Sequence, residues 1–472
     1  MSVDALRRST PSAEGVDARG IEALLDVFEA HPGIRPHGLV LLRHGAVIAE
    51  GWWAPYSADR VQLLYSVSKS FTATAAGLAR AEGLIDFEAP VIDYFPEYDA
   101  EITDARTRRM RVRDIAAMAS GHAEETLDRA LETGQGDLIR GFLRTPLDAE
   151  PGTLFAYNQP CTYTLGAIVQ RAAGQSLSEY LRPRLFEPLG IRDTWWEQAP
   201  AGVDIGFSGL HATTDAVARL GQLYLQRGRW GDTQLLDEAW VEEATRAQIS
   251  TATHEKRDWR FGYGFQFWPS THGYRADGAY GQFSIVLPEH DAVLALTTES
   301  SDTQDLLELV WAKLVPALGG GEPDAAADAR LAARLAGAQL AVPTLAPHPD
   351  DPAAWRDAAF TVADADAPHP TSSLREVRLR AGADGSWSLV LVDAIGELVC
   401  ALGVDGWTVS EPDGIPLGVA GGWNDDGFHA EVAFLETPHT LRISCAAGGA
   451  ATTAWVTEPL GARELRALRR LG

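Results

Sequence analysis

Apolar and polar residues follow two kinds of spacing over the first two thirds of the chain. Apolar side chains recur at helical intervals over residues 21–31, and again from Ser66 to Gly83, a residue that commonly ends helices, so each stretch predicts a helix. Between these stretches, apolar runs on either side of a His44-Gly45 turn predict a β-hairpin. The N-terminal part therefore combines helical and extended segments.

The same two spacings continue to about residue 318. Helical patterns lie at residues 162–173, 214–227 and 305–317. Apolar runs typical of adjacent strands lie at residues 261–268, 281–287 and 292–298. Because strands stand at both ends of this region with helices between them, we expect an α+β fold in which helices flank an antiparallel sheet.

The pattern changes after the glycine run at residues 319–321. Residues 321–370 hold an Ala- and Asp-rich stretch that predicts one helix, followed by a Pro-, Ala- and Asp-rich stretch typical of a linker. Beyond them, seven or eight short alternating strands with Gly, Asp and Pro turns predict a small antiparallel β-barrel or sandwich. We therefore expect a first domain over residues 1–320, a connecting segment over 321–370 and an all-β, barrel-like domain over 371–472.

The composition limits the kinds of molecule that we expect this protein to bind. The 472 residues, 46% of them hydrophobic, are enough for a large core in more than one domain. The formal charge of −25 argues against nucleic acid or an anionic membrane. No apolar run is long enough to span a membrane, the polar N-terminus lacks the apolar core of a secretion signal, and three cysteines make no disulfide framework. A reduced, cytoplasmic protein is the simplest interpretation.

The first chemical signal is the Ser-Val-Ser-Lys run that begins at Ser66. Ser66 and Lys69 are three residues apart, so both side chains lie on one face of the predicted helix. A serine hydroxyl needs a base, and lysine can serve when burial and the helix N-terminus lower its pKa toward neutrality. The alternative is an N-cap serine beside a solvated lysine, but here the flanking residues are small or apolar.

Two further segments can complete such a site. Tyr157 lies in a loop just before a predicted helix, and a tyrosine that faces a serine–lysine pair can act as a second acid or base, its pKa lowered by the ammonium group. Residues 276–282 form a glycine-containing stretch that runs into a strand, where Ala279 can supply an oxyanion-binding N–H. On local evidence alone, Tyr157 is an ordinary half-buried aromatic residue and residues 276–282 are a plain hairpin turn.

Together, the three elements resemble the serine β-lactamase-related superfamily, which includes class C β-lactamases, D-alanyl-D-alanine carboxypeptidases and related esterases and amide hydrolases. The resemblance covers roughly residues 10–318 and rests on the order and spacing of the motifs. It extends to SKSFTATAAGLARAEGLIDFEAPVIDYFPE from residue 68 and YTLGAIVQRAAGQSLSEYLRPRLFEPLGI from residue 163. The fold that it implies has an antiparallel sheet flanked by helices and an all-α subdomain.

The resemblance implies a two-step mechanism through an acyl-enzyme. Ser66 would attack a carbonyl, Lys69 and Tyr157 would pass its proton to the leaving group, and water activated by the same groups would release the acid. The N–H groups of Ser66 and Ala279 would form the oxyanion hole. The family's substrate-binding positions correspond to Asn158, Gln159, Ala276 and Gly278. We expect neither a metal nor a cofactor.

Two departures from the family's pattern bear on the substrate. The family's Tyr-x-Asn motif ends here in Gln159, with Asn158 beside it, so an amide is kept but its reach changes by one methylene. The third motif usually begins with Lys or His and then Thr or Ser, which bind a substrate carboxylate, but here it reads Ala276-Asp277-Gly278. Ala276 offers no cation, and Asp277 would repel an anion. We therefore expect weak or no β-lactamase activity and a neutral ester or amide as substrate, with a D-amino-acid peptide left open.

Two other functions would use the same residues. An acyltransferase would form the same acyl-enzyme and pass the acyl group to an alcohol or amine instead of water. A slowly deacylating penicillin-binding or sensor protein would stop at the acyl-enzyme. In each case we expect a small-molecule ester or amide as the partner, no nucleic acid and no membrane, and we leave a homo-oligomer open.

Overall fold

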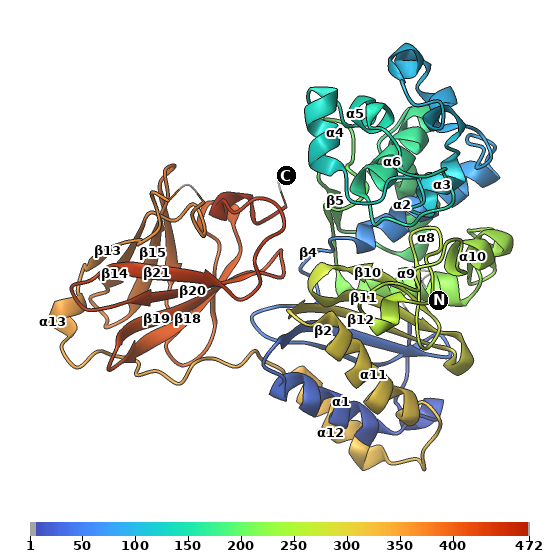
Figure 1. Cartoon of the computed structure of the whole chain (residues 1–472). Helices are drawn as coiled ribbons and strands as arrows, with labels where there is room; N and C mark the ends of the chain where they lie inside the picture. Colours follow the sequence, from blue (N-terminus) through green and yellow to red (C-terminus); the bar gives the residue numbers. More distant parts are fainter. Residues whose placement is uncertain (1–5, 368, 471–472) are drawn as a thin grey trace.

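The computed structural model describes residues 6–367 and 369–470, so the first five residues of the polar N-terminus lie outside it. Two parts stand side by side in Figure 1: a mixed region in which helices surround a sheet, and an all-β region formed by the C-terminal strands, coloured orange to red. Buried hydrophobic residues form a separate core in each region. The chain is therefore a mixed α+β protein with several sheets.

The base of the mixed region is a seven-stranded sheet, made of β1 (Arg7–Arg8), β2 (Ile34–Arg43), β3 (Ala46–Trp52), β9 (Trp268–Pro269), β10 (Tyr274–Gly278), β11 (Gln282–Leu287) and β12 (Ala292–Ser300). In space the order is β1-β3-β2-β12-β11-β10-β9. The hairpin expected at His44-Gly45 joins β2 to β3, and β12 pairs antiparallel with β2. That pairing brings the two ends of the mixed region together. The antiparallel pairing of β11 with β12 confirms the strands expected over 281–287 and 292–298.

Helices cover both faces of this sheet (Figure 1). One face packs against α1 (Ala18–Ala30) and α12 (Ala325–Ala336), with α11 (Thr303–Ala317) beside α1. The other face packs against α9 (Thr214–Leu225) and, near β10 and β11, against α2 (Val67–Ala81). The sequence prediction of these five helices is thus confirmed, apart from a few residues at their ends.

A group of helices stands above the sheet and holds two of the three motifs. Here α2 packs along α6 (Gln159–Ala173), the helix expected over residues 162–173. Around this pair lie α3 (Val112–Ala116), α4 (Leu127–Gly134), α5 (Leu138–Arg144), α7 (Leu177–Leu181), α8 (Glu187–Leu189) and α10 (Glu238–Thr245). Two small sheets complete the region: β4 (Gln62–Leu63) with β6 (Leu210–Ala212) and β5 (Thr194–Trp196), and the hairpin β7 (Arg229–Trp230) with β8 (Thr233–Gln234).

The strand expected over residues 261–268 is not formed. Its last residue, Trp268, begins β9, but the rest is an irregular segment whose Tyr263, Phe265 and Phe267 are buried in the core. A Cβ on Gly264 would lie 2.1 Å from the Ala244 carbonyl oxygen, so the backbone here runs against another segment instead of pairing with a strand. A short apolar run does not by itself distinguish a strand from buried irregular chain.

The C-terminal strands form two antiparallel sheets. The first contains β13 (Ala359–Thr361), β14 (Glu376–Ala381), β15 (Trp387–Val392) and β16 (Glu397–Ala401). The second contains β17 (Thr408–Ser410), β18 (Leu417–Asn424), β19 (Gly427–Phe434), β20 (Thr440–Cys445) and β21 (Ala451–Trp455). Side chains from both sheets share one hydrophobic core. Single bridges at Val362–Ala451 and Gly403–Ala420 join the sheets, but among the described residues no continuous ladder closes them, so the barrel suggested by the sequence is not seen.

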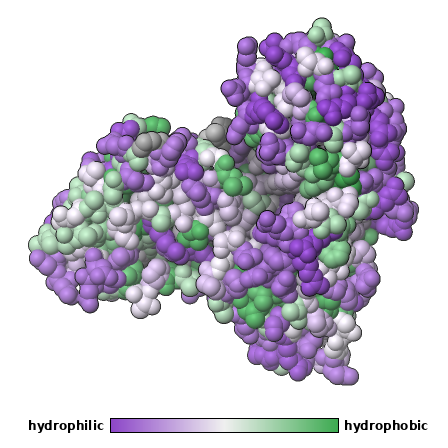
Figure 2. Space-filling view, in the orientation of Figure 1, coloured by the Kyte–Doolittle hydropathy of each residue, from purple (hydrophilic) through white to green (hydrophobic). Residues whose placement is uncertain are grey.

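The molecular surface is largely hydrophilic, as expected for a chain in which 22% of the residues are charged. Figure 2 shows hydrophilic residues over much of the visible face, and a recess where the C-terminal sheets meet the mixed region. In the part of the chain that the structure describes, no helix is long and apolar enough to cross a membrane. The three cysteines are all buried as free thiols.

Candidate active site

Helix α2 begins next to Ser66 and is buried along nearly its whole length. Ser66 is the N-cap residue and remains partly exposed, whereas Lys69 is 1% exposed. The helix can pass through the core because its hydroxyl side chains bond to neighbouring backbone carbonyls: Ser70 Oγ donates to Gln266 at 2.7 Å, and Thr72 Oγ1 donates to Gly206 at 2.8 Å. Ser66 is therefore held at a fixed helix N-terminus, where backbone N–H groups lack partners within the helix.

Lys69 places its amino group among three acceptors that carry no charge. Its Nζ donates to Ser66 Oγ at 2.9 Å, to Gln159 Oε1 at 2.6 Å and to the Phe207 carbonyl at 2.7 Å. These three bonds use every donor of a lysine. Burial lowers the pKa of Lys69 to about 7, although acidic side chains farther away oppose this shift. The lysine is thus able to exchange a proton with Ser66 near neutral pH.

Tyr157 approaches the same pair from the loop before α6. Its ring centroid lies 4.9 Å from Lys69 Nζ, and its hydroxyl shares a hydrogen bond with Ser66. Burial raises the pKa of this phenol and outweighs that bond, so the lowered pKa expected from the sequence is wrong. Tyr157 is therefore a neutral phenol at neutral pH, able to donate or relay a proton but not to act as the resting base. Its ring stacks on Trp268, with the centroids 5.8 Å apart.

The side-chain amides of the neighbouring residues Asn158 and Gln159 bond to different partners. Asn158 is fully buried at the N-cap of α6, and its Oδ1 accepts hydrogen bonds from the N–H and the hydroxyl of Thr126 at 2.9 and 3.0 Å. Gln159, one residue later, turns toward Lys69 and accepts its hydrogen bond. Of the two amides that the sequence offered for substrate binding, the structure therefore brings only Gln159 to the serine–lysine pair.

The third motif lies directly against the start of α2. Ala276 is fully buried on β10, and Gly278 ends that strand. A Cβ on Gly278 would lie 2.4 Å from the Leu64 carbonyl oxygen, so only glycine lets the strand end approach the turn before Ser66 this closely. Ala279 follows in a short 3-10 turn and is partly exposed. The strand end and the turn that carries Ser66 are therefore in contact.

Asp277 is paired with a cation from its own strand. Arg275 Nε donates to Asp277 Oδ2 at 2.8 Å, because alternate residues of a strand share a face. The Arg275 guanidinium is fully buried and also lies 4.3 Å from the ring centroid of Trp259. Burial raises the pKa of Asp277, and the adjacent Arg275 opposes that shift. The repulsion of anions expected from an isolated Asp277 is therefore reduced by its partner.

Some contributions to the site had no recognisable signal in the sequence. Phe207 acts through its backbone carbonyl, which every residue type possesses. Glu125 fixes the start of α6, because both carboxylate oxygens accept from the Gln159 N–H at 3.1 Å. Trp268 is one of 14 tryptophans in the sequence, and its position against Tyr157 depends on the irregular segment before β9, which was expected to be a strand.

An apolar groove of about 1010 Å³ lies along α6; the motif residues do not line it, but Phe207, whose carbonyl accepts from Lys69, does. Phe207 lines the end nearest to Lys69, and Tyr163 and Ala167, one and two turns after Gln159, line the groove along the helix. Arg171, at the other end, is paired with Glu97 at 2.5 Å. Other lining side chains are mostly apolar and include Phe95, Tyr98, Leu127, Leu138, Ile139 and Val203.

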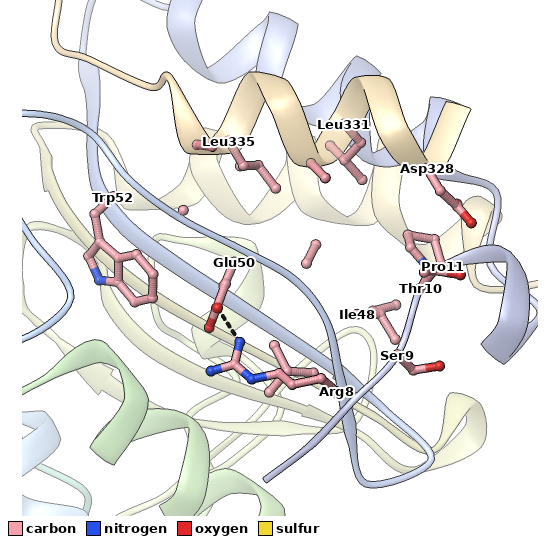
Figure 3. A pocket seen from close by; sticks show the side chains of 15 residues that line it. Arg8, Ser9, Thr10, Pro11, Ile48, Glu50, Trp52, Asp328, Leu331 and Leu335 are labelled. Carbon is pink, nitrogen blue, oxygen red and sulfur yellow. Dashed lines mark ion pairs between the residues drawn. The ribbon is translucent and has the colours of Figure 1, made fainter. Parts of the chain in front are cut away.

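Another pocket, of about 440 Å³, is built from different elements. It lies between β1, β3 and α12, and Figure 3 shows Leu331 and Leu335 of α12 above it. Its walls carry one ion pair, between Arg8 and Glu50. Neither the motif residues nor the hydrogen-bond partners of Lys69 line this pocket, so we do not connect it with the chemistry at Ser66.

Comparison with known proteins gives a family and a fold. The family model named Beta-lactamase matches residues 21–318, more than half of the chain. The 6-aminohexanoate-dimer hydrolase of Paenarthrobacter ureafaciens is 30% identical over 219 residues, covering 43% of this chain and 55% of that protein. Esterase EstB of Burkholderia gladioli is 28% identical over 212 residues, covering 39% of this chain and 53% of that protein. The chain thus spans about half the length of these two curated relatives.

A solved structure extends the similarity to the C-terminal sheets. The octameric penicillin-binding protein homologue from Pyrococcus abyssi matches with a TM-score of 0.52 and 15% identity, covering 90% of this chain and 98% of that chain. At this identity the likeness shows the fold alone. The family model, the fold and the motifs lead to one conclusion: the chain belongs to the β-lactamase family, within the serine β-lactamase-related superfamily.

Proposed function

We propose that this protein is a serine hydrolase that forms an acyl-enzyme on Ser66 and cleaves a neutral ester or amide. The proposal rests on Lys69, which is fully buried, donates to Ser66 Oγ and has no carboxylate among its three hydrogen-bond acceptors. A lysine in such surroundings keeps a depressed pKa, and a nearby base of this kind is what an unactivated serine needs. Membership of a hydrolase family supports the same class of reaction.

In the proposed acylation step, neutral Lys69 takes the hydroxyl proton of Ser66 as Oγ bonds to the substrate carbonyl carbon. The carbonyl π electrons move to its oxygen, and the N–H groups of Ser66 and Ala279 stabilise the resulting oxyanion. When the intermediate collapses, the bond to the leaving group breaks, and Tyr157 passes that group a proton that Lys69 replaces.

Deacylation repeats these steps with water as the nucleophile. The water oxygen bonds to the acyl carbon as Lys69 takes one of its protons. The bond from the acyl carbon to Ser66 Oγ then breaks, and Oγ regains a proton from Lys69, so the acid leaves and the resting enzyme is restored.

The charges around the pair support an uncharged substrate. The Arg275 guanidinium is fully buried and its Nε is bonded to Asp277, so it presents no exposed cation to a substrate carboxylate. Ala276, at the position where relatives carry a cation, is buried and has no charge to offer. A neutral ester or amide needs neither group.

The groove along α6 supports an apolar group on that substrate. Its near end shares Phe207 with the lysine site, and its lining by aromatic and aliphatic side chains favours a hydrocarbon over a polar chain. We infer that the groove receives the apolar acyl chain of the substrate.

The purified 472-residue chain and three classes of substrate test this function: p-nitrophenyl esters, D-amino-acid amides and nitrocefin. We expect turnover of the esters or amides, labelling of Ser66 by a fluorophosphonate, and loss of both in Ser66→Ala. Product analysis with added alcohol separates hydrolysis from acyl transfer. Ester hydrolysis that survives Ser66→Ala, or nitrocefin hydrolysis as efficient as that of a dedicated β-lactamase, would contradict the proposal.

A further inference from the structure

Two tyrosines flank the proposed oxyanion donors in an uncommon backbone conformation. Tyr65 directly precedes Ser66, and Tyr280 directly follows Ala279, and their φ angles are +47° and +63°. Bulky L-residues seldom adopt positive φ, because the Cβ crowds the backbone, and those that do are held there by surrounding contacts. Both proposed oxyanion donors are therefore next to a strained turn that other parts of the molecule must hold.

The C-terminal region holds both turns through His439. This residue is fully buried just before β20, and its Nε2 lies 2.5 Å from the Tyr65 hydroxyl oxygen. The rings of Tyr65, Tyr280 and His439, here called the ring cluster, pack edge to face with centroid distances of 5.5, 5.8 and 5.2 Å. The Tyr280 hydroxyl also donates to the Glu458 carbonyl, in the segment that follows β21.

The hydrogen bonds of the ring cluster have one consistent direction. His439 Nδ1 lies 2.8 Å from the Thr457 carbonyl, which can only accept, so Nδ1 carries the proton and Nε2 accepts from Tyr65. Burial lowers the pKa of His439 to about 4, which keeps the ring neutral at neutral pH. Tyr65 is thereby tied to the backbone of the C-terminal region.

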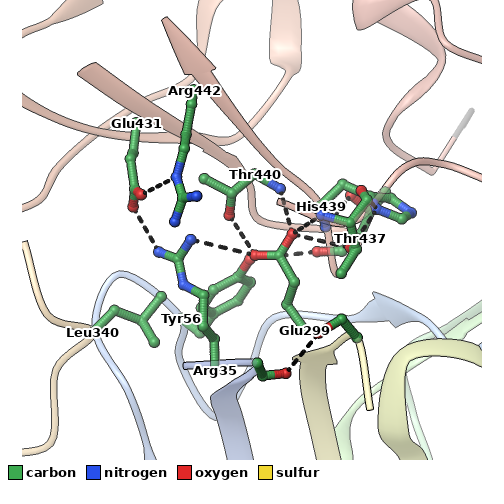
Figure 4. A network of polar contacts seen from close by, with 12 residues as sticks. Arg35, Tyr56, Glu299, Leu340, Glu431, Thr437, His439, Thr440 and Arg442 are labelled. Atoms are coloured by element: carbon green, nitrogen blue, oxygen red, sulfur yellow. Dashed lines mark hydrogen bonds and ion pairs between the residues drawn. The ribbon is translucent and has the colours of Figure 1, made fainter. Parts of the chain in front are cut away.

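Glu299 fixes the same segment to the main sheet. It lies near the end of β12, and Figure 4 shows its carboxylate beside Arg35, Thr440 and His439. The N–H and hydroxyl of Thr440 donate to it at 3.0 and 2.8 Å, and those of Thr457 at 3.2 and 3.0 Å. Thr440 directly follows His439 in the chain, and the Thr457 carbonyl accepts a hydrogen bond from the His439 ring. By bonding both threonines, Glu299 holds the two backbone segments that contact His439.

We propose that His439 is a positioning residue for Ser66, and that the C-terminal sheets therefore help to hold the active-site residues in place. This inference rests on the proposed hydrolase function. By holding the turns at Tyr65 and Tyr280, His439 sets the direction of the Ser66 and Ala279 N–H groups and of Ser66 Oγ. Its removal lowers the rate of acylation more than the binding of substrate.

The test uses the full chain and variants that separate the hydrogen bonds from the packing. His439→Ala removes the ring and both bonds, whereas His439→Gln keeps an acceptor for Tyr65 and a donor for Thr457. The measurements are the rate constant for fluorophosphonate labelling of Ser66, and kcat and KM for a p-nitrophenyl ester. We expect His439→Ala to lower the labelling rate and kcat by about tenfold or more with KM little changed, and His439→Gln to restore much of the loss.

Ile443→Ala is the matched control, since Ile443 is buried in the core of the C-terminal sheets outside the ring cluster. It should lower Tm and leave the labelling rate within about twofold of the wild type. A His439→Ala labelling rate equal to that of the wild type, or an equal loss of rate in both variants, overturns the positioning role. Tyr65→Phe, which removes one hydroxyl, provides the same comparison should His439→Ala fail to fold.

Hydrogen exchange supplies a readout that does not depend on catalysis. Peptides that contain residues 64–68 and 278–282 should exchange faster in His439→Ala than in wild type, and remain unchanged in Ile443→Ala. Unchanged exchange in His439→Ala also overturns the inference. Failure of the wild type to label at Ser66 or to hydrolyse any ester or amide would instead refute the proposed function, and hydrogen exchange would still decide the positioning role.

Discussion

The proposed chemistry depends on the charge of Lys69 and on the balance that sets this charge. Hydrogen bonds to Ser66, Gln159 and the Phe207 carbonyl favour the ammonium form, whereas removal from water disfavours it. Burial is the larger effect, and a pKa of about 7 leaves close to half of the molecules with a neutral amine at pH 7. The uncharged acceptors matter because a carboxylate in their place would stabilise the ammonium form and remove the base.

This balance predicts a pH dependence. Only the neutral amine can take the Ser66 proton, so kcat/KM for a neutral ester should rise about tenfold per pH unit below pH 7 and level off above it. Lys69→Arg stays protonated and should lower kcat/KM by about a thousandfold throughout this range. Rate profiles from pH 5 to 9 with a non-ionising ester measure both effects. A wild-type profile that is flat from pH 5 to 8 would mean that another group is the base.

At the residue scale, the sequence could propose the groups with side-chain chemistry but not the contacts between them. Ser66 and Lys69 were recognisable because helical spacing places them on one face. The family resemblance placed Gln159 at the position whose amide meets the lysine, but the direction of the neighbouring Asn158 side chain stayed open, because it depends on where α6 begins, and helix boundaries are uncertain by a residue or two. The third acceptor, the Phe207 carbonyl, is a backbone group and has no side-chain signature.

Among the elements, α6 connects the serine–lysine site to the apolar groove. Gln159, Tyr163 and Ala167 are four residues apart and share one face, so the helix carries the amide that meets Lys69 and then part of an apolar wall. The rise from Gln159 to Ala167 is about 12 Å. Ala167 has a small side chain at this position, which leaves room for a chain of several carbons.

The groove predicts a preference for longer acyl chains. Each methylene that becomes buried should raise kcat/KM by about fourfold, from acetate upward until the groove is filled. Ala167→Trp should remove most of this dependence, because the indole would occupy the groove. Ala333→Trp makes the same substitution at an exposed position of α12 and should keep it. A series of p-nitrophenyl esters measures the effect. If kcat/KM depends on chain length in Ala167→Trp as it does in the wild type, the acyl chain binds outside this groove.

Long periodic elements were predictable from sequence, and those shaped by distant contacts were not. The five sheet-covering helices and the first hairpin follow from local spacing. In contrast, β18 was not predicted, because glycines at positions 418, 421 and 422 interrupt its alternation. The structure gives two of them a reason: a Cβ on Gly418 would lie 2.6 Å from the Pro55 ring, and one on Gly422 would lie 2.5 Å from the Ala346 carbonyl oxygen.

In the whole molecule, the mixed region and the C-terminal sheets meet at a polar junction. Arg35 of β2 is paired with Glu431 of β19 at 2.8 Å and lies 3.6 Å from Glu299 (Figure 4). These partners are far apart in sequence, so no local pattern could reveal them. We propose that the first domain continues through α12, since Leu331 and Leu335 belong to its core, and that the C-terminal sheets form the second.

The junction makes stability depend on the charge of Glu299. Its carboxyl group is fully buried, and burial raises its pKa from 4.5 to about 7, although Arg35 and the threonine hydrogen bonds oppose that shift. Because the pKa is higher in the folded state, the stability that Glu299 contributes is fully present below pH 4.5 and is lost as the pH rises through about 7. The shift corresponds to roughly 3 kcal/mol in the free energy of unfolding.

The amide side chain in Glu299→Gln does not titrate, so this variant isolates what the ionisation of Glu299 contributes to stability. The variant should be close to the wild type in stability at pH 4.5, because the amide, like the neutral carboxyl group, keeps one carbonyl oxygen for the bonds from Thr457 and from the Thr440 N–H, and can donate to the Thr440 hydroxyl. The difference in unfolding free energy, wild type minus variant, should then fall by roughly 3 kcal/mol between pH 4.5 and 8. Urea unfolding at several pH values measures it, and other titrating groups such as His439 cancel because both proteins contain them. A difference that stays constant over this range would mean that Glu299 remains charged in the folded protein, and that the junction is held by a permanent ion pair with Arg35 instead of a neutral carboxyl group.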